Sequence, residues 1–262
     1  MACLRIAYDG SEFSGSQRQP NCMTVENSII EALISVGYVN RFEELTTFRM
    51  ASRTDKGVSA RENLLNIECP NGDLRKNNML ERMNNSLDPI WITGFSGDVF
   101  KMPLEKTYHY HMLDHGYDLQ LAGELCNLFS GNHDYANLSK FDPRKETTRH
   151  LDMDYEFNGD TISLMFSGRG FLWQMCRRIA TVFIECLEER MTIEEVDDIL
   201  NRRSERKVMP ADAKGLILYS IRSNIGFEDV PSGLEKAWGH YAREKDNAKL
   251  ALGISRDFIS DG

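Results

Sequence analysis

The sequence predicts an α+β protein of two packed subdomains that share sheet structure, with a cleft between them. Three observations support this fold class. Short β-rich runs alternate with amphipathic helical runs along most of the 262 residues. No low-complexity linker separates the two halves, and their compositions are similar. We therefore divide the chain into an N-terminal α+β subdomain, residues 1–105, and a C-terminal α+β subdomain, residues 106–262, and expect ligands in the cleft.

The first hundred residues form one predicted α+β layer. Residues 3–8 alternate weakly between apolar and polar side chains, which predicts a strand that ends at Asp9-Gly10. Thr24 is a candidate N-cap for the next helix, in which apolar residues recur at helical spacing up to Gly37: Val25, Ile29, Leu33 and Val36. Three further runs are β-rich, 45–51, 63–69 and 90–95, and a polar helical stretch lies near 75–85.

A strand with two different faces opens the second half. In residues 106–113, a period of two puts Tyr108, Tyr110 and Met112 on one face and His109, His111 and Leu113 on the other. Further elements follow: a helix near 119–130, strands 151–157 and 160–166 joined across Asn158-Gly159-Asp160, and a helix from about 171 to 189. A capping box of Thr192 and Glu195 opens another helix, residues 215–221 form a strand, and the tail after about 225 reads as a helix.

The composition is that of a soluble globular protein, with 41% hydrophobic and 27% charged residues. No apolar run approaches the roughly 18 residues of a membrane span. Arg5 and Asp9 interrupt what would be the apolar stretch of a signal peptide. These features predict an intracellular protein without a membrane partner, located in the cytoplasm, or in the nucleus or mitochondria if the source is a eukaryote.

Neither the cysteines nor the histidines form a convincing metal site. The six cysteines are scattered without a C-x-x-C pair, which argues against a zinc ribbon and a disulfide framework, so we expect small buried apolar residues: Cys3, Cys22, Cys69, Cys126, Cys176 and Cys186. His109, His111 and His115 lie close together in sequence, but no carboxylate or thiolate accompanies them at matching spacing. We predict no metal site.

The net charge of −9 argues against a general basic coat for nucleic acid, because Lys and Arg side chains drive phosphate binding. A localised basic cleft on an acidic body is still compatible with this charge. Two clusters could supply it: Arg169 with Arg177 and Arg178, and residues 201–207. The plainer interpretation of the second cluster is a solvated helix end.

Residues 48–63, FRMASRTDKGVSAREN, need a separate explanation. A strand-like apolar run ends there in five residues without a large apolar side chain. A tight turn would account for Asp55 and Gly57. It does not account for the two cations, Arg53 and Lys56, that bracket one carboxylate. The stretch is either a solvated charged turn or a chemical site.

This stretch is one of five linked segments: YDGSEFSGSQRQ (8–19), ASRTDKGVSA (51–60), KTYHY (106–110), FSGNHDYANLSK (129–140) and GRGFLWQMCRRI (168–179). In order and approximate spacing they resemble the TruA-like family of tRNA pseudouridine synthases. The resemblance covers nearly the whole chain up to about residue 222. An Arg-Thr-Asp triplet alone would be weak evidence, whereas the linked segments are specific. Lys56 and Ser59 look more like the archaeal and eukaryotic branches than the bacterial one.

The resemblance implies a fold and a reaction. The fold is the pseudouridine synthase fold, with a mainly antiparallel sheet shared by two subdomains and a central RNA-binding cleft. The reaction breaks the glycosidic bond of a uridine in tRNA, turns the base and rejoins carbon 5 to the ribose without a cofactor. By the same resemblance we expect tRNA as partner, a homodimer, and target uridines in the anticodon stem-loop at tRNA positions 38–40.

Three residues match the catalytic positions of the family. Asp55 matches the carboxylate that acts either as nucleophile or as the base that removes a ribose proton. A carboxylate in a closed cleft stays ionised next to a cation, and Arg177 matches the family's motif arginine. Tyr108 matches the active-site tyrosine, which is placed to stack on the uracil and to help remove the proton from carbon 5.

Six further residues are assigned to RNA binding or support of the site: Arg18, Arg53, Lys56, His133, Arg169 and Arg178. For His133 a hydrogen-bonded structural role is the alternative. The chain departs from the family pattern at Ser16, where a Trp is usual, and in a short segment after residue 140. Both departures bear on which nucleotide is modified.

Other functions stay open at this level. One alternative is a noncatalytic RNA-binding protein of the same fold, although the presence of Asp55, Tyr108 and Arg177 together argues against it. A second is a synthase that acts at other tRNA positions. A nucleotide- or metal-dependent hydrolase is disfavoured because the sequence lacks a G-x-x-x-x-G-K phosphate loop.

Overall fold

The computed structural model describes residues 1–68, 70–204 and 206–259. Its strands are β1 Ala2–Tyr8, β2 Phe48–Met50, β3 Ser59–Ile67, β4 Ile90–Ser96, β5 Glu105–Leu113, β6 Gly131–Asp134, β7 Thr148–Phe157, β8 Thr161–Gly168, β9 Leu216–Arg222 and β10 Glu228–Asp229. They form one sheet in the order β10-β4-β1-β3-β9-β5-β8-β7-β6, with β2 paired to β3 outside this path. Within the described residues, the pair β3–β9 is parallel and the others are antiparallel. The predicted α+β class with a mainly antiparallel sheet is confirmed.

The α-helices are α1 Val25–Ser35, α2 Met79–Ser86, α3 Leu119–Phe129, α4 Met175–Leu187, α5 Ile193–Leu200 and α6 Pro231–Ile259. Three short 3-10 helices are η1 Phe42–Glu44, η2 Lys76–Asn78 and η3 Ala213–Gly215. The predicted caps are present: the Thr24 hydroxyl accepts from the Asn27 amide, and Thr192 and Glu195 form both bonds of the capping box. These caps start α1 and α5 where the sequence predicts them.

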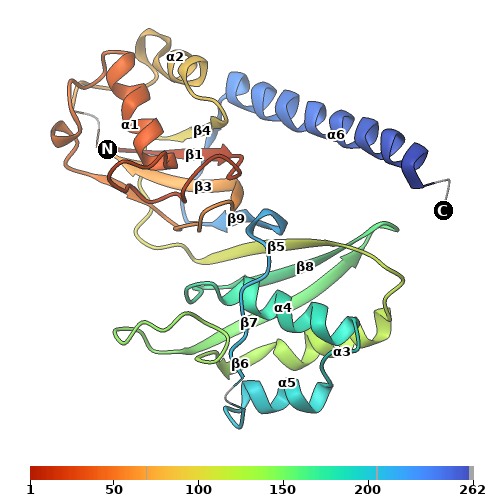
Figure 1. The fold of residues 1–262 in the computed structure, drawn as a ribbon. Helices are drawn as coiled ribbons and strands as arrows, with labels where there is room; N and C mark the ends of the chain where they lie inside the picture. The colour runs from red at the N-terminus through yellow and green to blue at the C-terminus, as the bar shows by residue number, and fades with distance from the viewer. Residues whose placement is uncertain (69, 205, 260–262) are drawn as a thin grey trace.

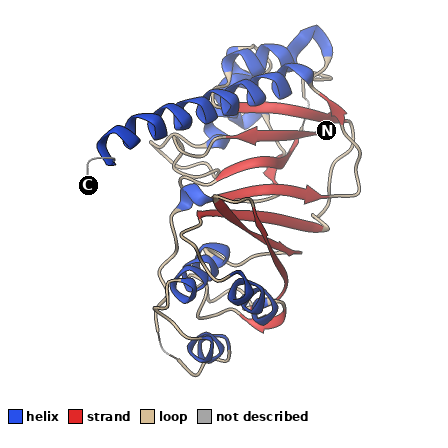
Figure 2. Cartoon of the chain, turned by 90° about the vertical axis from the view of Figure 1, so that its right-hand side faces the viewer, coloured by secondary structure: helices blue, strands red, loops and turns tan. Residues whose placement is uncertain are grey.

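The elements gather into two lobes (Figures 1 and 2). We call β1–β4 with α1, α2 and α6 the upper lobe, and β6–β8 with α3–α5 the lower lobe, after their places in Figure 1. Strands β5 and β9 lie between the lobes. Helices α3 and α4 contact β7 and β5, and α2 and α6 contact β4. The sheet therefore passes through both lobes, while the helices cover each lobe separately.

Burial explains why the strands have these sequences. Strand β1 is central in the upper lobe, and six of its seven residues are buried, so apolar side chains occupy both of its faces and Arg5 is the half-buried exception. In β5 the period of two is observed: Tyr108 and Tyr110 are buried, while His111 and Leu113 are exposed. The two-faced strand predicted for residues 106–113 is confirmed.

Several boundaries differ from the predicted ones. The helix expected from about 171 begins at Met175, because Gln174 has a left-handed backbone (φ 64) that cannot belong to the helix. Strand β2 keeps three residues of the predicted 45–51, and the short strands β6 and β10 were not predicted. The hairpin across Asn158-Gly159-Asp160 is present, with Gly159 at φ +84.

The C-terminal segment returns to the first half of the chain. Helix α6 packs on β4 and α2, and its His240 Nε2 lies 3.0 Å from Asp9 Oδ2, directly after β1. Lys236 of the same helix donates to the backbone oxygen of Asn84 at 2.7 Å. The division into residues 1–105 and 106–262 stays a prediction, and the last helix of the second part lies on the first.

Four of the six cysteines are buried as predicted: Cys3, Cys126, Cys176 and Cys186. Cys22 corrects that prediction, because the exposed loop before α1 leaves it half-buried. Cys69 lies outside the described residues. None of the described helices has the length and apolar character needed to cross a membrane.

Candidate active site

The loop between β2 and β3, residues 51–58, holds its polar side chains in fixed positions; we call it the Asp55 loop. The side chains alternate: Ser52 and Thr54 are buried, whereas Arg53 and Lys56 are exposed. The Thr54 hydroxyl lies 2.9 Å from the Tyr8 hydroxyl, and its amide donates to Ser16 Oγ at 2.8 Å. The polar run is therefore a braced loop that presents charges on its outer side, and not an ordinary solvated turn.

The loop of residues 9–16 supports the Asp55 loop from behind. Ser16, the residue that departs from the family pattern, is fully buried, and its amide donates to the Thr54 carbonyl at 3.1 Å. Gly10 lies against the backbone of Val58, so that a Cβ at Gly10 would meet the Val58 oxygen at 2.1 Å. Gly57, at φ +84, closes the turn after Asp55. The position of Asp55 thus depends on two segments that are far apart in sequence.

Asp55 is held by two side chains from the lower lobe. Arg177 Nη1, on α4, lies 3.2 Å from Oδ2 of Asp55, and Trp173 Nε1 donates to Oδ1 at 3.0 Å. The Asp55 side chain is 28% exposed and that of Arg177 is 14% exposed, so the ion pair is largely shielded from solvent. Arg177 Nε also donates to the Ala211 oxygen at 2.7 Å, which fixes the guanidinium. The carboxylate is therefore oriented on both oxygens and keeps an open side.

Tyr108 reaches the same place from β5. Its ring is buried and packs edge-on against Phe171, with the ring centroids 5.0 Å apart. Its hydroxyl lies 2.7 Å from Ser52 Oγ. Burial raises the pKa of Tyr108 far above its ordinary value, and the hydrogen bond with Ser52 opposes that shift. The hydroxyl is therefore neutral in the resting protein.

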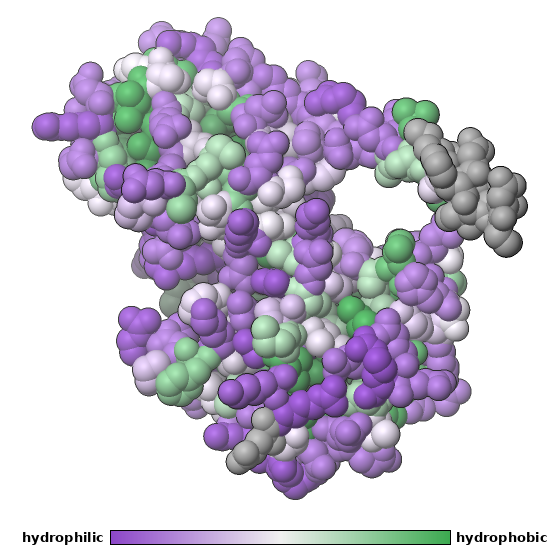
Figure 3. All heavy atoms as spheres, viewed as in Figure 1, coloured by the Kyte–Doolittle hydropathy of each residue, from purple (hydrophilic) through white to green (hydrophobic). Residues whose placement is uncertain are grey.

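A cavity of about 700 Å³ contains all three predicted catalytic residues, Asp55, Tyr108 and Arg177. The surface in Figure 3 is hollowed on the left between the two lobes. Among the described residues, the cavity is lined by six Lys or Arg side chains and two Asp side chains: Arg53, Lys56, Lys106, Arg144, Lys145 and Arg177 against Asp55 and Asp142. An acidic protein thus has a locally positive cavity, the arrangement that binding to a polyanion requires.

Only two of the six residues assigned to RNA binding line this cavity, Arg53 and Lys56. Arg18 is exposed beside it and lies over the Phe42 ring, and Arg169 is exposed after β8. Arg178 is next to Arg177 in sequence but points elsewhere, donating to the Val208 oxygen and to Gln174 Oε1. The RNA contacts of these residues stay predictions.

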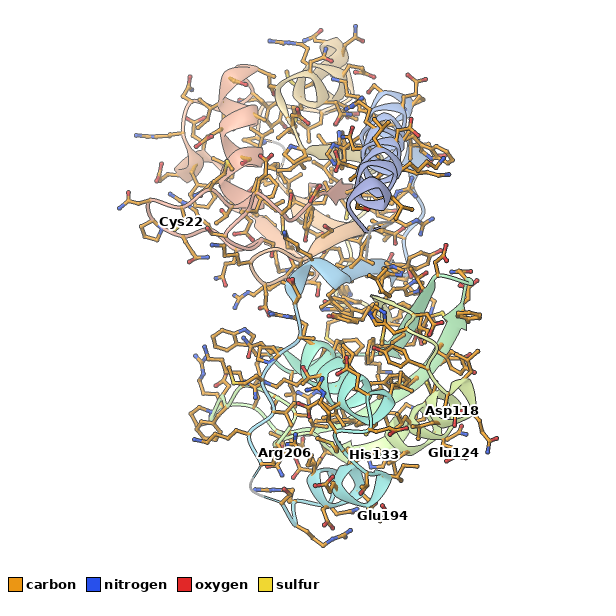
Figure 4. All side chains as sticks on the ribbon, turned by 45° about the vertical axis from the view of Figure 1, so that its right-hand side comes forward. Cys22, Asp118, Glu124, His133, Glu194 and Arg206 are labelled. Carbon is orange, nitrogen blue, oxygen red and sulfur yellow. The ribbon has the colours of Figure 1, made fainter. Side chains whose placement is uncertain are left out.

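His133 lies on β6 in the lower lobe. Its Nε2 is 2.9 Å from the Ser130 oxygen, and its ring packs edge-on against Tyr135. Figure 4 shows His133 in the lower part of that lobe, near the level of Arg206 and above Glu194. This position fits the alternative of a hydrogen-bonded structural residue better than a contact at the cavity.

The three arginines of the basic cluster near residues 201–207 pair with carboxylates. Arg202 pairs with Asp134 at 3.1 Å and Arg206 with Glu185 at 2.8 Å, while Arg203 pairs with Asp197 and Asp198. Glu205 lies outside the described residues. The described part of the cluster fits the predicted solvated helix end.

The histidines of β5 serve packing on the opposite face of the sheet from Tyr108. His109 stacks on Tyr219 with centroids 4.0 Å apart, and His111 Nδ1 lies 2.8 Å from Ser163 Oγ. Burial lowers the pKa of both imidazoles. Within the described residues, no three His, Cys, Asp or Glu side chains are grouped as a metal would need.

Six residues at the site are not indicated by the sequence patterns. They are Ser52, Lys106, Phe171 and Trp173, together with Arg144 and Lys145. Lys106 lies in the KTYHY segment and Trp173 in the GRGFLWQMCRRI segment. These motifs predict that both residues are near the site, but they do not predict which atoms the two side chains contact. Arg144 and Lys145 belong to the short segment after residue 140, where no motif was recognised.

Comparisons with known proteins agree with this geometry. Residues 125–223 match the model of a family described as tRNA pseudouridine synthase. A protein of Thermococcus kodakarensis named tRNA pseudouridine synthase A is 35% identical over 98% of this chain and 97% of its own length. Proteins of the same name from Pyrococcus furiosus and Methanobrevibacter smithii are 34% and 32% identical, over 89% and 94% of this chain and 88% and 89% of their own lengths.

Proposed function

The chain belongs to the TruA-like family of tRNA pseudouridine synthases, and on that premise we propose that Asp55, Tyr108 and Arg177 carry out the isomerisation of uridine to pseudouridine in tRNA. One observation supports this assignment most directly. Residues from both lobes meet in one positively lined cavity, whose lining includes a carboxylate held on both oxygens and a buried tyrosine. A noncatalytic RNA-binding protein would have no need for this oriented carboxylate.

Asp55 acts on the ribose. Its carboxylate either attacks the sugar carbon of the glycosidic bond or removes a ribose proton, and in both cases it must be ionised. Arg177 Nη1 donates to Oδ2 and Trp173 Nε1 donates to Oδ1, so each carboxylate oxygen has its own side-chain donor. The same two donors restrict the rotation of the carboxylate and so hold it for attack.

Tyr108 acts on the base. Its ring lies in the cavity wall, where it can stack on a uracil turned out of the RNA. Phe171 packs against the ring edge and fixes its tilt. The uracil has to leave the stack of its neighbouring bases before it can enter the cavity. Arg53 and Lys56 are exposed on the outer side of the Asp55 loop, where they hold the phosphates that flank this base.

The direct test is a tritium-release assay on unmodified tRNA labelled at carbon 5 of uridine, followed by mapping of the modified position. Release in the presence of excess EDTA is expected, because the proposed chemistry uses no metal and no cofactor. We place the target in the anticodon stem-loop, at tRNA positions 38–40. A folded protein that binds tRNA without releasing tritium would instead favour the noncatalytic alternative, and a product elsewhere in the tRNA would favour a synthase of other specificity.

Affinity for tRNA should fall steeply with salt, because binding depends on the cations around the cavity. Arg53→Ala and Lys56→Ala should each reduce the slope of log affinity against log salt by about 1. A matched control is Arg203→Ala, because Arg203 is paired with Asp197 and Asp198 and does not line the cavity. Filter binding between about 50 and 200 mM salt measures the slopes, and an unchanged slope in both cavity variants would contradict this binding surface.

We expect two copies of the chain to act together, as the family resemblance implies. The functional unit is then a homodimer in which one tRNA contacts both subunits. Light scattering at micromolar concentration should give about twice the 30.0 kDa chain mass. A mass of one chain under the conditions of full activity would refute the dimer and leave the assignment of Asp55 untouched.

A further inference from the structure

Lys106 is a cation inside the cavity that lacks a carboxylate partner among the described residues. Its Nζ donates to the Ala51 oxygen at 2.8 Å and to Ser52 Oγ at 3.0 Å, and both acceptors are neutral. Burial, with a smaller contribution from the charge of Lys145, lowers the pKa of Lys106 to about 8. A lysine in this range exchanges its proton near neutral pH, as general-base lysines do.

Ser52 connects this amino group to Tyr108. Its Oγ is 3.0 Å from Lys106 Nζ and 2.7 Å from the Tyr108 hydroxyl, so the three groups form an unbroken hydrogen-bonded chain. The chain begins at the hydroxyl of the residue that acts on the base and ends at an amino group. Backbone contacts hold Ser52 in place, because its amide donates to Asn63 Oδ1 and its oxygen accepts from Asn63 Nδ2.

Tyr108 alone is a poor proton acceptor. Burial raises its pKa, so a tyrosinate ready to take a proton is scarce at neutral pH. A neutral tyrosine can accept a proton only if it gives up its own at the same time. Ser52 is the hydrogen-bond partner through which that proton can leave.

We propose that Tyr108, Ser52 and Lys106 form a proton relay, in which Lys106 takes up the proton that Tyr108 passes on as it removes hydrogen from carbon 5 of the base. This inference rests on the proposed function and adds a residue to it. Because Lys106 acts through Ser52 and Tyr108 and does not touch the base, it is a positioning residue. Its role is to keep the Tyr108 oxygen able to accept.

The proton and electron balance of the step is closed. The C5–H bond breaks and its electron pair forms the C5–C6 double bond, while the electrons of the C6–N1 double bond move to N1, which takes a proton from water. The proton from C5 goes to the Tyr108 oxygen, the Tyr108 proton goes to Ser52 Oγ, and the Ser52 proton goes to neutral Lys106 Nζ. The ammonium group then returns its proton to solvent. No oxidant or reductant takes part.

The test compares Lys106→Met and Ser52→Ala with the unchanged protein. With uridine in the tRNA, each variant should lose about 10²-fold in kcat, the lower end of the range for proton-transfer catalysis, and KM should stay within about threefold. The deuterium isotope effect at carbon 5 should increase. The rise of kcat with pH near 8 should disappear in Lys106→Met, and Lys106→Arg should not restore it because Arg stays charged.

A second substrate separates the relay from a structural role. In tRNA that carries 5-fluorouridine, carbon 5 has no hydrogen, so the relay has nothing to remove, whereas bond cleavage and rejoining still need Asp55. Lys106→Met and Ser52→Ala should therefore form the rearranged fluorinated nucleoside at the rate of the unchanged protein. Lys145→Met should shift the rise of kcat to higher pH, because it removes a like charge that lowers the pKa of Lys106.

Three results would overturn the relay. If both variants process 5-fluorouridine as slowly as uridine, Lys106 and Ser52 only hold the Asp55 loop. If Lys106→Arg is fully active and the rise of kcat with pH is unchanged, proton exchange at Lys106 is not used. If both variants keep full kcat on uridine, the chain is not part of the step. Failure of the unchanged protein on both substrates would instead refute the proposed function itself. Thermal melting of each variant checks that it is folded.

Discussion

Asp55→Asn should abolish tritium release from labelled tRNA, with a loss of roughly 10⁴-fold or more, the size seen when a nucleophile or its base is removed from other enzymes. Asparagine keeps the size of the side chain and can still accept from Trp173 Nε1, but it can neither attack the ribose nor take its proton. Binding of tRNA should persist or tighten slightly, because one negative charge facing the RNA is gone.

The matched control for this variant is Asp142→Asn. Asp142 lines the same cavity and loses the same charge, but its described partner is Arg144 and it does not contact Arg177 or Tyr108. Its turnover should stay within a few-fold of the unchanged protein. Near-normal pseudouridine formation by Asp55→Asn would show that Asp55 is a turn residue, and loss of binding by the folded variant would show that its role is in RNA contact.

Arg177→Met should lower kcat by about 10²- to 10³-fold, the effect typical of removing one oriented electrostatic contact from an active site. Without the guanidinium, Asp55 keeps only the bond from Trp173, and the Ala211 oxygen loses its donor. In the double variant with Asp55→Asn, the second substitution should add little, because the two residues act as one unit. Single-turnover kinetics on bound tRNA measures the loss without the contribution of binding.

Arg178→Met provides the comparison within α4. Arg178 holds the Val208 oxygen much as Arg177 holds the Ala211 oxygen, but it has no bond to Asp55. A similar loss in both variants would mean that the effect comes from the connection between α5 and η3, and not from the ion pair. Arg177→Lys should recover only part of kcat, since an ammonium group cannot bind Asp55 and Ala211 in the same planar geometry.

The sequence predicts those helices and strands that have a clear hydrophobic period or a recognisable capping residue. Helix α1 begins after the Thr24 cap, and β5 shows the expected two faces. Strands β6 and β10 have four and two residues, too few for a period to be recognised, and they exist because β7 and β4 offer hydrogen-bonding edges to them. The start of α4 depends on the left-handed backbone of Gln174, which its residue type does not indicate.

At the site, the sequence indicates which residues are involved, but not the direction in which their side chains point. Arg177 and Arg178 are adjacent and chemically identical, yet helical geometry turns one toward Asp55 and the other toward Val208. Trp173 lies in an irregular loop, whose side-chain direction has no period to reveal it. Lys106 contacts residues more than fifty positions earlier in the chain, a pairing set by how the Asp55 loop meets β5. The linked motifs identify the segments that contain these residues, and only the packed structure shows which of their side chains contact one another.

Strand β9 has a consequence for the order in which a ribosome produces this protein. It is synthesised after nearly all the site residues, yet it pairs with β3 through Ser59 and Ala60 on one side and with β5 on the other. No described pairing joins β3 to β5 directly. A nascent chain that has reached η3 already contains Asp55, Tyr108 and Arg177, but its two halves are not yet joined through the sheet. Translation must therefore pass β9 before the two halves are joined through the sheet, and a message broken before the codon for Leu216 yields every candidate catalytic side chain without the strand that connects them.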